Sequence, residues 1–391
     1  MKHIVISKNF INVVIIAISL LGLYFCFTGG YGSDEDTLPM MYVFEQRLGT
    51  GNFATSRFTS FPVAEMGIGF LAYFFGSWAA NLFTFTFLIL GLYFFYLSLE
   101  IKKEIKNINI FFLLTLTSPI LFFDNLEPVD YSWSFFFFSL GLYFFSRKKN
   151  ELAILFFAFS VGVRINYILF VLIAIFYFDT TYTIKKKLEI FIITFIFSGM
   201  FYVPIWYENA LTLNWLTAAR PTDQGLIGIL ARFFYKSYFA IGTISFFIIF
   251  WHFIKRIKEI KKINNINFLA LLIFANLLIF LWIPAEFSYI QLFLVVMFFI
   301  VLKSKNFTFI YLIVFLNLLS WIFVINPIEV KHIDSSMCGE KNAKSANINI
   351  QIEEGFFMRY VNSRQMIKCR IDNNSERGRR ILKGKSTRIK N

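Results

Sequence analysis

Acidic and arginine residues recur in the polar stretches that separate long apolar segments of this chain. The first such stretch contains three consecutive acids, Asp34, Glu35 and Asp36, and it continues through Arg57 to Glu65. A carboxylate can take the proton from an acceptor hydroxyl as that hydroxyl attacks a sugar C1. A guanidinium can hold a phosphate through charge-assisted hydrogen bonds and stabilise it as a leaving group. These residue types therefore suit transfer of a group from a phosphate-linked donor.

Residues of the same kinds appear in later polar stretches, and the further candidates for a site are Glu127, Asp130, Arg164, Arg220, Glu286 and Tyr289. An ionisable group at membrane depth is costly, so it usually marks a pathway or a site. Each of these residues, taken alone, can also be a solvated loop charge or an interfacial anchor. The argument for a shared site is that all of them fall on one side of the topology predicted below.

The composition predicts a polytopic helical membrane protein. The mean hydropathy is +0.63, 57% of the residues are hydrophobic, and 55 of 391 are Phe. A soluble domain of this length could not bury so much apolar surface. Apolar runs of membrane-spanning length recur from Ile11 to Asn326. The first run, Phe10–Phe27, is long for a signal peptide and no typical cleavage site follows it, so we expect a retained helix with a cytoplasmic N-terminus.

Basic residues in short loops set the predicted topology. The net charge of +14 lies largely in such loops, where Lys and Arg orient membrane helices, so we expect no nucleic-acid partner. Placing every basic cluster inside gives about eleven crossings, at roughly 10–28, 78–99, 109–123, 132–146, 151–163, 166–180, 188–205, 237–253, 266–283, 287–302 and 307–325. One apolar segment, Phe61–Gly76, is left over. If it spanned the membrane, every later cluster would change side, so we predict a surface or re-entrant helix at the outer face.

This topology divides the chain into a membrane domain, residues 1–326, and a small extracytoplasmic tail, residues 327–391. Within the tail, Asn347–Ile352 alternates polar and apolar residues and predicts a strand, whereas the basic end from about residue 377 is expected to be disordered. Cys338 and Cys369 could form a disulfide in an exported tail, or they could be two unrelated thiols. The chain has only three histidines, without ligand-like spacing, so no zinc site is expected.

Short motifs in the polar stretches follow a particular order. The run SDED after the first helix is followed by a G-x-x-x-x-S-R-F-x-x-x-P-x-x-E pattern, formed by Gly51, Ser56, Arg57, Phe58, Pro62 and Glu65. A second acidic loop, EPVDYSW, opens the fourth crossing, and G-x-R follows at Gly162 and Arg164, with PAEFSY later. Together these features cover about residues 10–300. They resemble the membrane glycosyltransferases of the GT-C superfamily, in particular the bacterial mannosyltransferase-like members.

The resemblance implies an all-α, GT-C-like bundle with surface helices in its first outer loop, in a bacterial cytoplasmic (inner) membrane. It also implies an inverting glycosyltransferase of cell-envelope polysaccharide biosynthesis. Its partners would be a polyprenyl-phosphate-linked sugar donor, a glycan or lipid acceptor and membrane lipid. On this basis Asp34 or Asp36, or else Glu35, is the candidate base. The candidates for binding substrate are Arg57, Arg164 and Arg220 toward the phosphate, with Glu65, Glu127, Asp130, Glu286 and Tyr289 around them.

The sequence departs from the family pattern in three places. The three consecutive acids blur the usual pair, the usual P-G-Y-P is replaced by T-S-F-P, and no large outer domain follows the last crossing. Carboxylates could also hold a divalent cation, but their spacing does not establish such a site. Two other functions compete. A polysaccharide polymerase would be expected to concentrate its site in central or late loops, and a lipid-linked-sugar flippase would be expected to show repeat symmetry, which is absent from this sequence.

Overall fold

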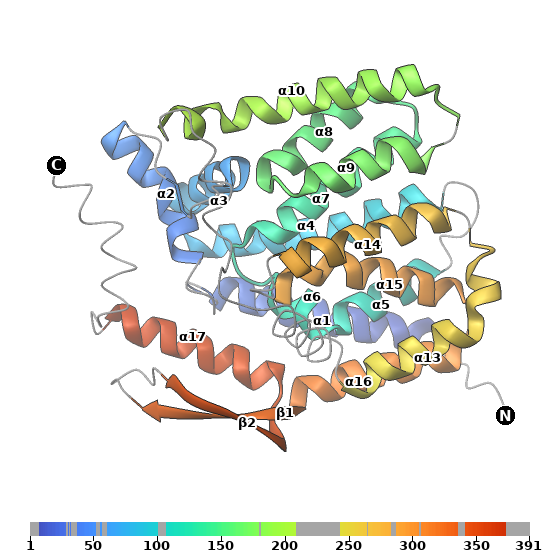
Figure 1. Ribbon diagram of the computed structural model, residues 1–391. Helices are drawn as coiled ribbons and strands as arrows, with labels where there is room; N and C mark the ends of the chain where they lie inside the picture. Colours follow the sequence, from blue (N-terminus) through green and yellow to red (C-terminus); the bar gives the residue numbers. More distant parts are fainter. Residues whose placement is uncertain are drawn as a thin grey trace.

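The chain forms a bundle of long helices that lie side by side, with shorter elements gathered at one end (Figure 1). The computed structural model describes residues 8–28, 30, 32, 37–51, 55–56, 61–100, 107–179, 181–208, 243–263, 265–282, 287–304, 306–334 and 341–372. The helices of the bundle are α1 (Lys8–Thr28), α4 (Ser77–Leu99), α5 (Ile108–Thr117), α6 (Pro119–Phe123), α7 (Asp130–Ser146), α8 (Asn150–Val163), α9 (Tyr167–Ile173), η2 (Ala174–Phe178), α10 (Ile184–Glu208), α13 (Thr243–Ile260), α14 (Ile266–Trp282), η3 (Phe287–Ile290), α15 (Gln291–Lys303) and α16 (Phe307–Ile322).

Each apolar segment predicted to cross the membrane overlaps at least one of these helices. Within the described residues, three helices are long and apolar enough to span a membrane by themselves: Asn9–Thr28, Ser77–Leu99 and Ile184–Glu208. The other apolar helices are shorter, and some are interrupted. Between α5 and α6, for example, Ser118 is extended, as the residue before a proline prefers, and Pro119 begins the next helix. The polytopic all-α class is therefore confirmed, whereas the number of crossings stays a prediction.

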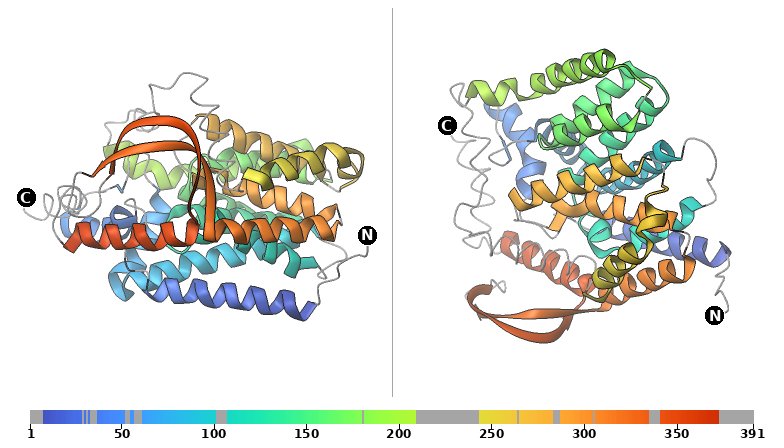
Figure 2. Two further views of the ribbon diagram at one scale, coloured as in Figure 1. Left: turned by 90° about the horizontal axis from the view of Figure 1, so that it is seen from below. Right: turned by 45° about the vertical axis from the view of Figure 1, so that its right-hand side comes forward.

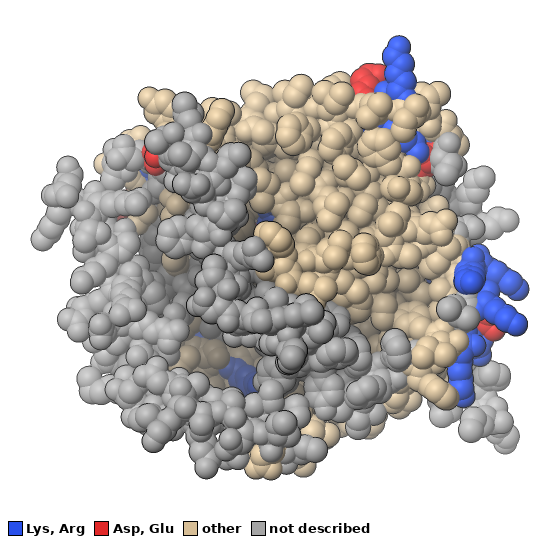
Figure 3. Space-filling model, in the orientation of Figure 1, with Lys and Arg blue, Asp and Glu red and all other residues tan. Residues whose placement is uncertain are grey.

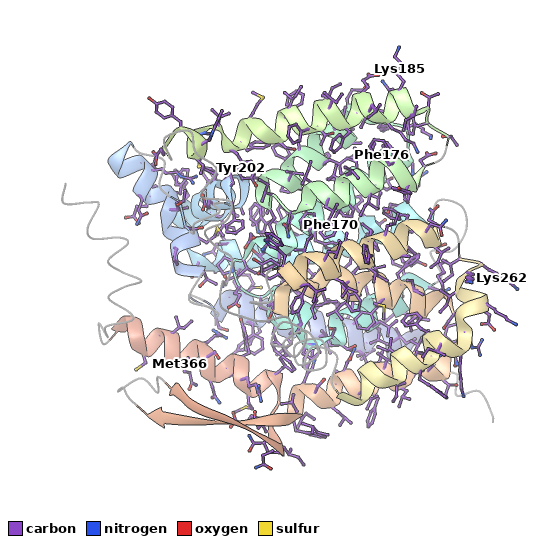
Figure 4. All side chains as sticks on the ribbon, in the orientation of Figure 1. Phe170, Phe176, Lys185, Tyr202, Lys262 and Met366 are labelled. Atoms are coloured by element: carbon purple, nitrogen blue, oxygen red, sulfur yellow. The ribbon has the colours of Figure 1, made fainter. Side chains whose placement is uncertain are left out.

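The two ends of the bundle differ in charge. Figure 3 shows Lys and Arg side chains gathered at one end, and Figure 4 places Lys185 and Lys262 there, with Met366 of the C-terminal helix at the opposite end. The basic loops between helices, such as Arg147–Lys149 and the turn after α13, supply cations of this kind. Because basic loops mark the cytoplasmic side of membrane helices, we predict that the opposite end, where Met366 lies, faces outward, and we call it the outer end below.

The segment left over from the topology, Phe61–Gly76, forms a separate short helix. Helix α2 (Thr37–Thr50) is followed by α3 (Pro62–Phe75), which begins at a proline and ends at Gly76, where φ is +87°. A positive φ suits glycine and turns the chain directly into α4. At 14 residues α3 is shorter than the roughly 20 residues that a spanning helix needs. Exposed aromatic side chains on it, among them Phe70 and Phe74, fit the predicted surface helix.

The C-terminal part forms a small cap at the outer end. Helix α16 ends at Ile322, and β1 (Phe323–Asp334) follows at once, so the cap begins before the expected boundary at residue 327. Strand β1 pairs antiparallel with β2 (Lys341–Glu354), which contains the predicted strand at residues 347–352. Helix α17 (Phe356–Asp372) then returns to the bundle. Its Cys369 is disulfide-bonded, while Cys338 and the basic end lie outside the described residues.

Helix α8 approaches two neighbours very closely near its end. A Cβ atom at Gly162 would lie 2.6 Å from the Phe201 ring of α10 and 2.7 Å from a Val63 methyl of α3. The Tyr202 hydroxyl of α10, which points into the bundle in Figure 4, donates a hydrogen bond of 2.7 Å to the Val161 carbonyl. Since Gly162 belongs to the predicted G-x-R motif, its missing side chain lets α3, α8 and α10 meet beside Arg164.

We therefore expect Gly162→Ala to destabilise the protein by about 1–3 kcal/mol, the usual cost of overpacking a close contact. Gly199→Ala in α10 is the matched control, because nothing lies within 4 Å of the Cβ that it would add. The detergent-solubilised variants are heated, and the loss of the monodisperse peak in size-exclusion chromatography gives the midpoint of thermal unfolding for each. Equal midpoints for the two variants would show that the close approach at Gly162 is not a packing constraint.

Candidate active site at the outer end of the bundle

A buried ion pair joins two of the sequence-predicted site residues. Asp130 is the first residue of α7, and Arg164 directly follows the last residue of α8. The Arg164 Nη1 atom lies 2.8 Å from the Asp130 Oδ2 atom, and the two side chains are 4% and 0% exposed. Charges as deeply buried as these are tolerated only as a pair. The ion pair therefore fixes the end of α8 against the beginning of α7.

Aromatic rings surround the Arg164 guanidinium. Its Cζ atom lies 3.9 Å from the ring centre of Tyr131, 4.7 Å from that of Tyr289 and 5.3 Å from that of Phe61. At these distances a ring face attracts a cation. The rings come from α7, from η3 and from the residue before α3, so the guanidinium draws three distant parts of the chain together. Three predicted residues, Asp130, Arg164 and Tyr289, thus share one site.

A small polar cavity opens beside this cluster. Besides Arg164 and the two tyrosines, its lining includes Asn276 of α14 and Gln291 of α15. The Asn276 Oδ1 and Gln291 Nε2 atoms are buried and have no hydrogen-bond partner within the described residues. The cavity measures about 10 Å³, which is room for one water molecule. Sequence reasoning missed both amides; the available signal was a lone amide inside, or at the start of, an otherwise apolar run.

A second buried ion pair organises the first outer loop. Glu65 of α3 accepts a hydrogen bond of 2.5 Å from Arg47 Nη2 of α2, and both side chains are buried. Its other carboxylate oxygen accepts hydrogen bonds from the Ser56 backbone N–H, at 2.8 Å, and from the Ser56 hydroxyl, at 2.6 Å. Glu65 therefore holds α2, α3 and the connecting loop together. These bonds already engage both carboxylate oxygens of Glu65. Its predicted contact with substrate stays a prediction.

Glu127 belongs to the second outer loop, but in space it lies beside Gly32, where the first outer loop begins. Gly32, just after α1, has φ +79°, and a Cβ atom there would lie 2.5 Å from Glu127 Oε2. The chain at the end of α1 is itself anchored by Asn81 of α4, whose Nδ2 atom donates to the carbonyls of Cys26 and Gly30 at 3.3 and 3.4 Å. The buried Glu127 carboxylate thus lies next to Gly32, and the acidic run begins two residues after Gly32 in the sequence.

The remaining predicted site residues, Asp34, Glu35, Asp36, Arg57, Arg220 and Glu286, lie outside the described residues, and their roles stay predictions. In the part of the chain that the structure describes, no group of three or more His, Cys, Asp or Glu side chains could hold a metal ion.

The fold has counterparts among solved structures. No protein-family model and no curated protein matches the chain. The chain is similar to ArnT from Cupriavidus metallidurans in the apo state, with a TM-score of 0.52 and 12% identity over 75% of this chain and 58% of that one. It is also similar to ArnT bound to undecaprenyl phosphate, with a TM-score of 0.55 and 12% identity over 76% and 60% of the two chains.

ArnT is a GT-C glycosyltransferase, so the chain has the GT-C fold that its sequence motifs predict. It spans about three fifths of the ArnT chain. The closer resemblance to mannosyltransferase-like members stays a prediction.

The ion pair can be tested by a double-mutant cycle. We expect Asp130→Asn and Arg164→Gln each to destabilise the protein by about 3–5 kcal/mol, because each leaves one buried charge without its partner. The double variant should lose clearly less stability than the sum of the losses in the two single variants. The measurement is denaturant-induced unfolding in detergent micelles. Asp179→Asn is the control, since its ion pair with the exposed Lys148 should contribute only about 0–1 kcal/mol. Strict additivity at Asp130 and Arg164 would contradict the coupling.

Proposed function

We propose that the protein is an inverting membrane glycosyltransferase, which moves a sugar from a polyprenyl-phosphate donor to a glycan or lipid acceptor at the outer face of a bacterial cytoplasmic membrane. The observation that carries the proposal is the buried Arg164–Asp130 pair with Tyr289 at the outer end of a GT-C fold. The bound undecaprenyl phosphate in one ArnT structure supports a donor of this class.

The proposed reaction is a single displacement at the sugar C1. The acceptor hydroxyl attacks from the face opposite the phosphate, and Asp34 or Asp36 takes its proton. The bond between C1 and the phosphate oxygen breaks, and the polyprenyl phosphate leaves with the electron pair. Arginines stabilise the negative charge that develops on it. We assign this role to Arg57 and Arg220, and to the edge of Arg164 that Asp130 does not occupy.

The side chains that line the cavity beside Arg164 suit the sugar end of such a donor. Asn276 and Gln291 offer buried amide atoms that have no partner among the described residues, and hydroxyl groups of a sugar could satisfy both. The aromatic rings of Tyr131 and Tyr289 border the same space and could stack on a sugar ring. Because the cavity holds about one water molecule, the donor would have to displace these side chains on entering.

The acidic run can be tested directly. Asp34→Asn/Asp36→Asn should lower transfer by about 10²–10⁴-fold while the protein still inserts and accumulates, because a general base typically contributes that much. The assay combines purified protein, candidate polyprenyl-phosphate sugars and a pool of glycan and lipid acceptors. Glu151→Gln, an exposed acid at the other end of the bundle, is the control and should transfer normally.

The same assay separates the alternatives. A product anomer that is the opposite of the donor's supports inversion, and retention would contradict it. Growth of a long polymer from oligosaccharide units would favour the polymerase. Movement of lipid-linked sugar across a bilayer without a new glycosidic bond would favour the flippase.

The phosphate assignment predicts a kinetic signature. Arg57→Lys keeps the charge but loses the planar two-point fork of arginine, so it should raise the donor concentration needed for half-maximal transfer. The acceptor requirement should change much less. Initial rates measured over a donor series and an acceptor series, each at saturating co-substrate, distinguish the two effects. Unchanged donor dependence would remove Arg57 from the phosphate site.

A further inference from the structure

A groove lies between the end of α1 and α17, where the Phe25 ring of α1 contacts the rings of Phe357 and Tyr360. Figure 2 shows α17 at the end of the bundle, next to the hairpin of β1 and β2. Its volume is about 670 Å³. Two of the lining side chains are cationic, and the chain just beyond α1 closes one end. The lining residues that matter here are Tyr24, Thr28, Gly32, Phe357, Arg364 and Lys368.

The groove lies at the level of the membrane surface. Phe27 of α1 stacks on Trp78 of α4 with ring centres 5.7 Å apart, and both side chains are exposed, as is Tyr24 one turn earlier. Exposed aromatic side chains at the end of a spanning helix mark the boundary between hydrocarbon and headgroups. Arg364 donates a hydrogen bond to the carbonyl of Thr28, the last residue of α1. Its guanidinium therefore lies at the depth of lipid phosphates.

The two cations face the groove from one side of α17. Arg364 and Lys368 are four residues apart, so they lie on the same face of the helix. The guanidinium of Arg364 is placed by the rings of Phe25 and Tyr360, at 5.4 and 5.5 Å from their centres. Arg359 lies on the same helix but is absent from the groove lining, and it pairs with Glu353 of the hairpin. The charge in the groove is thus a local arrangement and not a general property of α17.

The groove lies beside the start of the first outer loop. Gly32 lines it and also contacts Glu127, and the acidic run begins two residues later in the chain. On its other side the groove is bounded by Tyr24 and Thr28, which are exposed on α1 toward the membrane. A lipid could therefore keep its chain along α1 while its headgroup lies in the groove beside Gly32.

We propose that this groove binds the phosphate of a polyprenyl-phosphate lipid through Arg364 and Lys368, as a docking site distinct from the reaction centre at Arg164. The inference rests on the proposed function for its role in transfer, but binding itself can be measured without any transfer. The fit is chemical: a phosphate monoester carries more charge than the diester headgroup of a bulk anionic lipid, and two adjacent cations favour it.

The test measures binding of undecaprenyl phosphate to purified full-length protein by native mass spectrometry. We expect Arg364→Gln/Lys368→Gln to weaken binding about tenfold or more, since hydrogen bonds to charged groups are lost. Arg359→Gln, on the same helix but paired with the hairpin, should bind like the wild type. Undecaprenol, which lacks the phosphate, should bind all three proteins equally weakly.

Two results would overturn the docking site. Equal binding of undecaprenyl phosphate to the wild type and to the double variant would remove the cations from it. Equal competition by phosphatidylglycerol would show a general contact with anionic lipid. If binding depends on Arg364 and Lys368 but the wild type transfers no sugar, the proposed function fails while the lipid site stands. If the wild type does transfer sugar, free polyprenyl phosphate is the monoester that it releases, so added undecaprenyl phosphate should inhibit the double variant less than the wild type, with the maximal rate largely kept.

Discussion

The outer end of the molecule depends on the buried pair of Arg164 and Asp130. Apolar packing between helices has no direction, so it does not by itself set how far one helix extends past its neighbour. A guanidinium buried to 4% exposure must find a carboxylate, and that requirement fixes the ends of α7 and α8 together. The rings of Phe61, Tyr131 and Tyr289 then follow, because the same cation attracts them. One ion pair thereby brings α3, α7, α8 and η3 to a single point.

Among the described residues, buried ion pairs are unevenly distributed between the two ends. Arg47 and Glu65 form a second buried pair at the outer end, where they connect α2 with α3. The pairs Lys186–Glu189 and Arg256–Glu259, in contrast, join exposed neighbours on one helix, and such pairs contribute little to stability. Among the described residues, the pairs with both side chains under 10% exposed are therefore the two at the outer end. An end built only for stability would not need charges that must be desolvated.

The sequence predicted the elements well and their partners poorly. Apolar runs indicate helices because the bilayer leaves the backbone no other partner, and the alternation of basic clusters already argued that Phe61–Gly76 is a surface helix. The cost of burying Arg164 was also readable from its apolar surroundings. The sequence did not show which carboxylate pairs with Arg164, since two outer loops offered several. Asn276 and Gln291 escaped notice because each is a lone amide beside an apolar run, and their shared cavity exists only after α14 and α15 pack.

The contact between Arg364 and Thr28 was equally hidden from sequence reasoning, because 336 residues separate the two in the chain. No local pattern connects the end of α1 with α17, yet their meeting creates the cationic groove. A polyprenyl carrier moves within the plane of the membrane, and its chain cannot leave the hydrocarbon without a large free-energy cost. The phosphate of such a carrier therefore lies at the membrane surface. Under the proposed docking site, helix α17 returns from the C-terminal cap to the end of α1 and holds Arg364 and Lys368 where such a phosphate would lie.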